Sequence, residues 1–119
     1  MYTARTESLA KLEALVHLKT ALAPRLVLVD ATIPDALVAT LHGALPTAWD
    51  DVPDSGAARS VGDSWLRRGS SLAVEVPSVH SGSETNVLIN PAHPHFAQLV
   101  IGNPVPFGFD RRLIDPSLR

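Results

Sequence analysis

Apolar side chains recur at spacings of three and four residues near the start of the chain, at Leu9, Leu12 and Leu15 or Val16. This stripe, with charged residues outside it, predicts an amphipathic helix of about 15 residues. Thr6 is placed to cap the helix at its N-terminus, and Pro24 to end it. Because helix-forming sequence follows Met1 almost at once, we expect no leading strand.

Short apolar runs bounded by Pro, Gly and polar residues predict several strands. They are residues 26–29, 71–76, 86–90 and 98–101. The two middle runs are joined by a polar turn and suit an antiparallel pair. A second helix is predicted over residues 59–68, ended by Gly69. Residues 35–41 are expected to form one or two helical turns and residues 42–57 a loop, so the pattern as a whole predicts an α+β domain.

The composition narrows the range of functions. The chain has 119 residues, no Cys and a formal net charge of −2. Its length suits a single modest core, and the missing Cys excludes thiolate metal sites, disulfides and a Cys nucleophile. Direct binding to nucleic acid or to an anionic membrane is disfavoured, since both need a basic excess. No apolar run approaches the ~18 residues of a membrane span, and we expect a cytoplasmic protein.

Two candidate chemistries are weak. His93 and His95 flank a proline and could reach one ion, but a zinc site needs a third or fourth ligand at a recognisable spacing. Serines at positions 70, 71 and 78 lack the Gly-x-Ser-x-Gly turn of a serine hydrolase. We therefore expect neither a metal site nor a serine hydrolase.

Glu13 is the unusual residue of the first predicted helix. On the helical wheel it lies closer to Leu9 and Val16 than Lys11 does. A carboxylate at the margin of an apolar stripe is costly unless it is paired or exposed. Two interpretations stay open: a boundary residue exposed to water or paired with a Lys or His17, and a functional carboxylate in a cleft above the helix.

Ordered motifs run along most of the chain. They are Tyr2-Thr3, Glu7-Ser8-Leu9-Ala10, Leu12 to Leu18, Gly62-Asp63-Ser64-Trp65-Leu66, Val76-Pro77-Ser78, Asn86-x-Leu88-x-Asn90-Pro91-x-His93-Pro94, and Pro106-Phe107 to Leu113. Their order and spacing resemble the RES-domain family, the toxins of toxin–antitoxin pairs whose antitoxin is a helix-turn-helix protein. The resemblance covers residues 2–113 and leaves 114–119 as a C-terminal tail.

The resemblance implies a fold and an activity. The fold is a split antiparallel sheet with helices, similar to ADP-ribosyltransferases. The activity is that of a type II toxin that degrades NAD by cleaving the nicotinamide–ribose bond, as a glycohydrolase or a phosphorylase. NAD is then the substrate, and no cofactor is expected. The expected partner is an antitoxin of the Xre type, which would cover the NAD site and carry any DNA binding.

Site residues follow from the same resemblance. The family pattern holds an Arg, a Tyr, a Glu eleven residues after that Tyr, and a later Ser. Tyr2 and Glu13 have this spacing, and the Ser falls on Ser71, with Ser70 as the alternative. Glu13, Tyr2 and Ser71 are the expected catalytic residues. Tyr2, Ser71 and Asn90 are expected to bind the substrate.

The family's Arg belongs to a Gly-Gly-Arg-Trp segment that precedes the Tyr, whereas this chain has a single residue before Tyr2. We therefore expect an N-terminally incomplete domain with a partly exposed Tyr2, an unpaired sheet edge, and self-association of the isolated chain. Arg59, Arg67 and Arg68 are the candidates to replace the missing cation. Two alternatives to an NAD-degrading toxin remain: a degenerate homologue that only binds the antitoxin, and an ADP-ribosyltransferase that acts on a protein.

Overall fold

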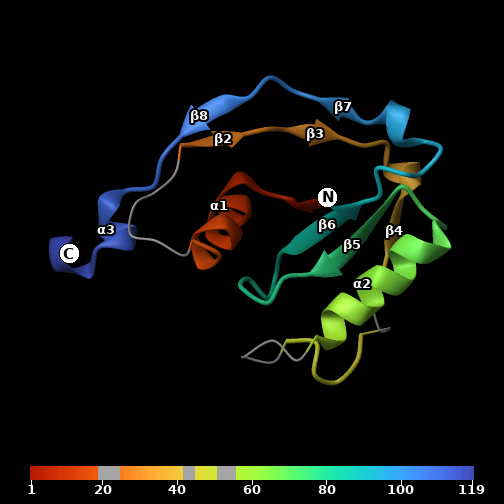
Figure 1. Cartoon of the computed structure of the whole chain (residues 1–119), viewed down its shortest axis with the longest axis horizontal. Coiled ribbons are helices and arrows are strands. Elements are labelled where there is room, and N and C mark those ends of the chain that lie inside the picture. Colours follow the sequence, from red (N-terminus) through yellow and green to blue (C-terminus); the bar gives the residue numbers. More distant parts are fainter. Residues whose placement is uncertain (19–24, 42–44, 51–55) are drawn as a thin grey trace.

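A four-stranded sheet forms the centre of the molecule (Figure 1). The structure, a computed structural model, describes residues 1–18, 25–41, 45–50 and 56–119. The strand order is β1-β6-β5-β4, for β1 (Tyr2–Ala4), β4 (Val38–Thr40), β5 (Ala73–Pro77) and β6 (Thr85–Ile89). β1 and β5 both pair with β6 in the antiparallel sense, and β4 pairs with β5 in parallel. The predicted antiparallel pair is thus confirmed and forms the middle of the sheet.

The expectation that no strand precedes the first helix is wrong. The N-terminal ammonium group of Met1 donates a hydrogen bond to the carbonyl of Ile89 (2.7 Å), and the Ile89 N–H donates to the carbonyl of Met1 (2.8 Å). The Arg5 N–H donates to the carbonyl of Thr85 (3.2 Å). These bonds to β6 stabilise the three-residue strand β1, which no apolar pattern in the sequence predicts. Within the described residues β1 is an edge strand, as expected. A groove of about 720 Å³ lies between it and the strands β2 (Leu26–Leu28) and β3 (Ala31–Thr32).

The two longer helices begin and end on local signals. α1 (Glu7–Val16) starts after Thr6, whose hydroxyl oxygen accepts the Leu9 N–H at 3.2 Å, so the predicted cap is confirmed. Its ten residues are fewer than predicted, and residues 19–24, up to the predicted end, lie outside the described ranges. α2 (Ala57–Arg68) ends as predicted at Gly69, whose φ of +59° is a left-handed conformation that glycine adopts without strain.

Two short antiparallel ribbons form a long arm beside the sheet, drawn in orange and blue in Figure 1. β2 (Leu26–Leu28) pairs with β8 (Val105–Phe107), and β3 (Ala31–Thr32) pairs with β7 (Val100–Ile101). Residues 35–41 are not the predicted helical turns throughout. A 3₁₀ turn occupies Asp35–Leu37, and the next three residues form β4 because β5 offers them a parallel partner. A short α3 (Arg111–Ile114) follows the arm.

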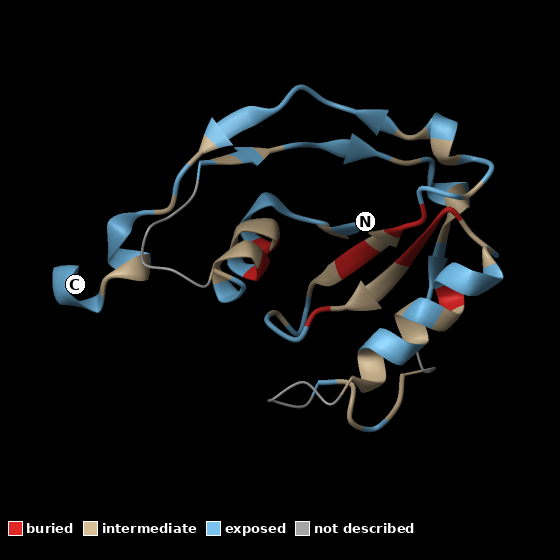
Figure 2. Ribbon diagram, viewed as in Figure 1, coloured by how far each residue is buried: buried red, intermediate tan, exposed pale blue. Residues whose placement is uncertain are grey.

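The buried core is small and centred on β5 and β6 (Figure 2). Its members are Leu72, Ala73, Val87 and Ile89, with Ile33, Leu37, Val38, Phe96 and Leu99 packed around them. α2 lies against the sheet: a Cβ added at Gly62 would be 3.7 Å from Leu88 Cδ1. The strands of the arm are mostly exposed. In the part of the chain that the structure describes, three α-helices and antiparallel-dominated sheets make an α+β fold, as predicted. Within the described ranges, no helix is long and apolar enough to cross a membrane.

Candidate active site

A cavity of about 690 Å³ opens between α1, α2 and the sheet. Its lining is mostly apolar, with a few titratable and aromatic side chains. Those are Tyr2, Glu13, His17, Trp49, Arg59, Asp63, Trp65 and His80. A largely apolar pocket with a small number of convergent polar groups is the usual form of a small-molecule site.

Glu13 is a buried carboxylate at the wall of this cavity. It lies one helical turn after Leu9 on α1, and only 8% of its surface is exposed. Its oxygen Oε1 accepts a hydrogen bond from Asn86 Nδ2 (2.8 Å) and one from Ser78 Oγ (3.3 Å). These partners lie in and beside the central strands, so tertiary contacts stabilise the buried charge. Of the two interpretations, the structure favours the carboxylate in a cleft.

The second carboxylate oxygen has a different environment. Oε2 lies 3.6 Å from Nε2 of His80, and the carboxylate also forms a hydrogen bond with Tyr2. Lys11 pairs with Glu7 instead, at 2.7 Å. The charge of Glu13 is thus stabilised mainly by the groups that donate to Oε1, namely Asn86 and Ser78.

Tyr2 stands beside Glu13. The residue is 59% exposed, in agreement with the expected partial exposure, but its hydroxyl oxygen accepts a hydrogen bond from Asn86 Nδ2 at 2.6 Å. Burial of the hydroxyl end raises the pKa of Tyr2 to about 12, helped by the negative charge of Glu13 and a hydrogen bond to Glu13, and opposed by the hydrogen bond from Asn86. The phenol is therefore protonated at neutral pH.

The structure brings Tyr2 and Glu13 together, but it does not bring Ser71 or Asn90 to them. Ser71 precedes β5, and its hydroxyl oxygen accepts the indole N–H of Trp65 at 2.8 Å. Asn90 follows β6, where its side-chain oxygen accepts the Ala92 N–H at 3.0 Å and closes a turn. Neither residue lines the described cavity, and neither does the alternative Ser70.

Three residues that sequence reasoning did not place in the site are found there: Ser78, Asn86 and His80. Ser78 and Asn86 belong to motifs quoted for the resemblance, and Ser78 is also one of the serines considered for a hydrolase. His80 lines the cavity, and its backbone N–H donates to Ser78 Oγ at 3.1 Å. The turn after β5 therefore supplies contacts to Glu13 that residue spacing does not reveal.

One of the three candidate arginines lines the cavity, namely Arg59. Arg67 instead donates to Ser64 Oγ at 3.3 Å on its own helix, and neither it nor Arg68 is among the described lining residues.

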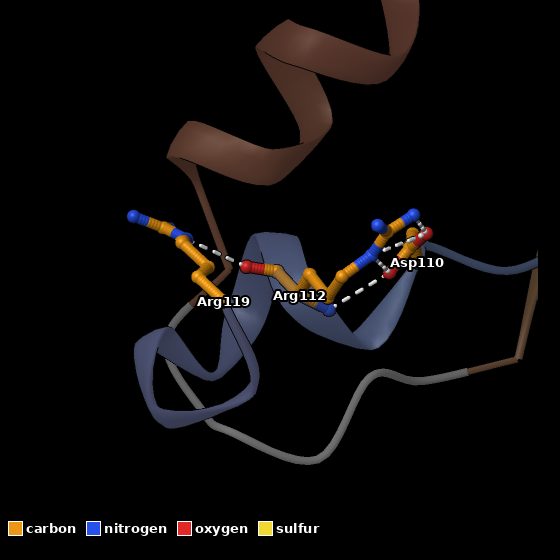
Figure 3. Close-up of polar contacts among 3 residues, drawn as sticks. All are labelled: Asp110, Arg112 and Arg119. Carbon is orange, nitrogen blue, oxygen red and sulfur yellow. Dashed lines mark hydrogen bonds and ion pairs between the residues drawn. The ribbon is translucent and has the colours of Figure 1, made fainter.

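Elsewhere, arginines of the C-terminal region contact their own neighbours (Figure 3). Arg112 forms a bidentate pair with Asp110, whose carboxylate oxygens lie 2.6 to 3.2 Å from its nitrogens. Arg119 donates to the Arg112 carbonyl at 2.9 Å. Among the arginines of the described residues, Arg59 is the one that lines the cavity.

The candidate metal pair forms a local turn. His93 Nδ1 accepts the backbone N–H of His95 at 3.1 Å, and the two ring centroids are 5.4 Å apart. Across the described part of the chain, no group of three or more potential ligands is close enough to hold an ion.

The fold and site describe a small α+β domain with a buried carboxylate and a tyrosine at one wall of an apolar pocket. Residues 1–110 match the RES domain family, and the chain belongs to that family. Its fold is accordingly ADP-ribosyltransferase-like, as expected.

Relatives support this membership. A protein of Sphingobium sp. (strain YBL2) named "Prs ADP-ribosylating toxin" is 38% identical over 79% of this chain and 62% of its own length. Proteins named "Toxin Res" from Yersinia enterocolitica and Photorhabdus laumondii are 34% and 31% identical, over 95% and 96% of this chain and 76% and 75% of their own lengths. The chain thus spans less than two thirds of the Sphingobium relative.

Proposed function

We propose that this protein is a toxin that cleaves the bond between nicotinamide and ribose in NAD. The observation that carries the proposal is the buried carboxylate of Glu13, held beside Tyr2 at the wall of the apolar cavity. Membership of the RES family and the toxin names of three relatives support it.

Glu13 supplies the electrostatic part of the mechanism. When the bond from ribose C1′ to the ring nitrogen breaks, its electron pair goes to nicotinamide, which leaves as a neutral molecule. Positive charge then develops on the ribose. A fixed carboxylate in a pocket of low polarity stabilises that charge far more than it would in water. In this proposal Oε2 faces the ribose, because Oε1 already accepts two hydrogen bonds.

Aromatic side chains supply the walls. Tyr2 offers a ring face to the nicotinamide, and its protonated hydroxyl is held by hydrogen bonds with Glu13 and Asn86. Trp65 offers a second wall, and Ser71 holds the Trp65 ring through the indole N–H. In this proposal Ser71 acts on the substrate through Trp65 rather than by direct contact.

Arg59 is the proposed contact to the pyrophosphate of NAD. It lies on the described wall of the cavity, and a guanidinium pairs with phosphate oxygens in a bidentate fashion. Asp63, one turn later on α2, also lines the cavity. Its negative charge keeps phosphate towards the Arg59 end of the helix.

The acceptor of the ribose distinguishes two versions of the activity. Water or phosphate attacks C1′ and loses a proton to solvent in a glycohydrolase or a phosphorylase. A protein side chain attacks in an ADP-ribosyltransferase, and the name of the Sphingobium relative favours this second candidate for this chain. The same carboxylate stabilises the cation in each case.

A cytoplasmic toxin of this kind needs an inhibitor in its own cell. We propose a helix-turn-helix antitoxin that covers the cavity, and we place DNA binding on that partner because the chain has a net charge of −2. The names of the two "Toxin Res" relatives are consistent with such a pairing.

The deciding experiment follows nicotinamide release from NAD by the purified chain. Parallel reactions contain buffer alone, added phosphate, or a bacterial lysate as a source of protein acceptors, with ADP-ribose, ADP-ribose phosphate and labelled protein as the respective products. Release that is lost in Glu13→Gln supports the proposal. An absence of release in all three reactions from folded protein would contradict it.

A further inference from the structure

Asn86 is the most buried polar residue of the site. It lies on β6, opposite Val76 of β5 and Ala4 of β1, and only 1% of its surface is exposed. It does not line the described cavity. Any effect on a ligand must therefore pass through the groups that it contacts.

Its side-chain nitrogen serves both residues of the pocket wall. Nδ2 donates to the hydroxyl oxygen of Tyr2 at 2.6 Å and to Oε1 of Glu13 at 2.8 Å. An –NH₂ group has two hydrogens in a fixed plane, so the two acceptors are held at a fixed spacing. The bond to Oε1 also restrains the orientation of the Glu13 carboxylate.

The orientation of the Asn86 amide has a cost. Oδ1 is buried and has no hydrogen-bond partner among the described residues. Buried polar atoms are nearly always paired, but a flipped amide would point Oδ1 at the two oxygens that now accept from Nδ2. Contacts to Tyr2 and Glu13 thus fix the orientation at the expense of Oδ1.

From this geometry we propose that Asn86 is a positioning residue. Its amide clamps the Tyr2 hydroxyl and Oε1 of Glu13, which means that it holds these two groups at a fixed distance from each other. The Tyr2 ring and Oε2 then both face the nicotinamide–ribose bond. The inference rests on the proposed function for its catalytic consequence, but the clamp itself can be tested without any substrate.

The substrate-free test is a titration of Tyr2, the single tyrosine of the chain. The hydrogen bond from Asn86 lowers the pKa of Tyr2, whereas burial and Glu13 raise it. Asn86→Leu removes the donor, and Asn86→Asp replaces it by an acceptor of the same shape. Both should raise the phenol midpoint above that of the wild type. A variant that merely opened the fold would move the midpoint down, towards 10.0, the ordinary value for tyrosine.

Matched controls are the same two changes at Asn103, an exposed residue between β7 and β8. They should leave the midpoint unchanged. Circular dichroism at each pH verifies the fold. Where alkali unfolds the protein first, the comparison is repeated in the Glu13→Gln background, whose midpoint is lower. A midpoint that stays constant or falls in folded Asn86 variants overturns the clamp.

The catalytic test separates kcat from KM for NAD. Loss of the clamp displaces the carboxylate from the developing charge, so kcat should fall about 10- to 100-fold while KM changes little. Asn86→Leu should add little to Glu13→Gln, since both act through the same carboxylate. An unchanged kcat in an active enzyme overturns the positioning role. A wild type without NAD cleavage contradicts the proposed function instead, and the titration still decides the clamp.

Discussion

Replacing Glu13 by Gln should make Tyr2 a stronger acid. The change keeps the shape of the side chain and removes its charge. Burial, the charge of Glu13 and a hydrogen bond to Glu13 together raise the pKa of Tyr2 from 10.0 to about 12, against the hydrogen bond from Asn86. Gln removes the charge of residue 13 and leaves the burial of the Tyr2 hydroxyl. The midpoint should therefore fall below about 12 but stay above 10.0.

The size of this effect is measurable near pH 11. A phenol with a pKa of about 12 is roughly 9% ionised there, and one with a pKa of 10 is roughly 91% ionised. Phenolate absorbance reports the fraction directly because the chain has one tyrosine. Glu13→Gln should show a clearly higher phenolate fraction than the wild type at the same pH, with unchanged circular dichroism.

Linkage gives the same prediction in stability. A raised pKa means that the folded state keeps a proton that the unfolded chain releases, so stability is fully present below pH ~10 and is lost as the pH rises towards ~12. Two pKa units correspond to at most about 2.7 kcal/mol. Because Tyr2 is 59% exposed, solvent screening reduces this to about 1 kcal/mol. Urea titrations at pH 9 and pH 11 should show a smaller loss in Glu13→Gln. An equal or higher phenol midpoint in the folded variant would refute the placement of the Glu13 charge beside Tyr2.

The remaining predictions concern activity, fold and partners. Glu13→Gln should lower NAD consumption about 100-fold or more and keep the melting temperature within a few degrees, whereas retained activity with a much lower melting temperature would make Glu13 a packing residue. Arg59→Gln should raise KM for NAD about 10- to 100-fold but leave cleavage of phosphate-free nicotinamide riboside unchanged, with Arg68→Gln as the neutral control; equal effects on both substrates would exclude a phosphate contact. Ser71→Ala should lower the free energy of unfolding by about 1–3 kcal/mol, because the buried indole N–H of Trp65 loses its acceptor. An unchanged thermal melting curve would show that this hydrogen bond does not contribute to stability. The purified chain should not shift duplex DNA at physiological salt, and a salt-sensitive shift would assign it a nucleic-acid surface of its own.

The local signals in the sequence determined much of the secondary structure. Thr6 caps α1 and Gly69 ends α2 where the sequence predicts. The alternating runs before Pro77 and around Val87 became the paired central strands. Such features depend on neighbours within a few residues, so they can be predicted from the sequence alone.

The carboxylate was visible in the sequence for a related reason. Glu13 interrupts an apolar stripe, and its distance from Tyr2 matches a known pattern. What the stripe could not show is the set of partners that makes the buried charge tolerable. These partners, Asn86 and Ser78, lie more than 60 positions away along the chain, at separations of 73 and 65 residues.

Tertiary structure alone decided the two short edge strands and the serine nearest to the carboxylate. β1 and β4 are three residues long and owe their form to the partners β6 and β5, so no periodicity announces them. Ser71 and Ser78 both flank β5, one at each end. Nothing in the neighbouring residues distinguishes their roles. In the folded chain, however, Ser78 forms a hydrogen bond with Glu13, and Ser71 forms one with Trp65. Hydrogen bonds between distant segments depend on that path, which only the folded chain provides.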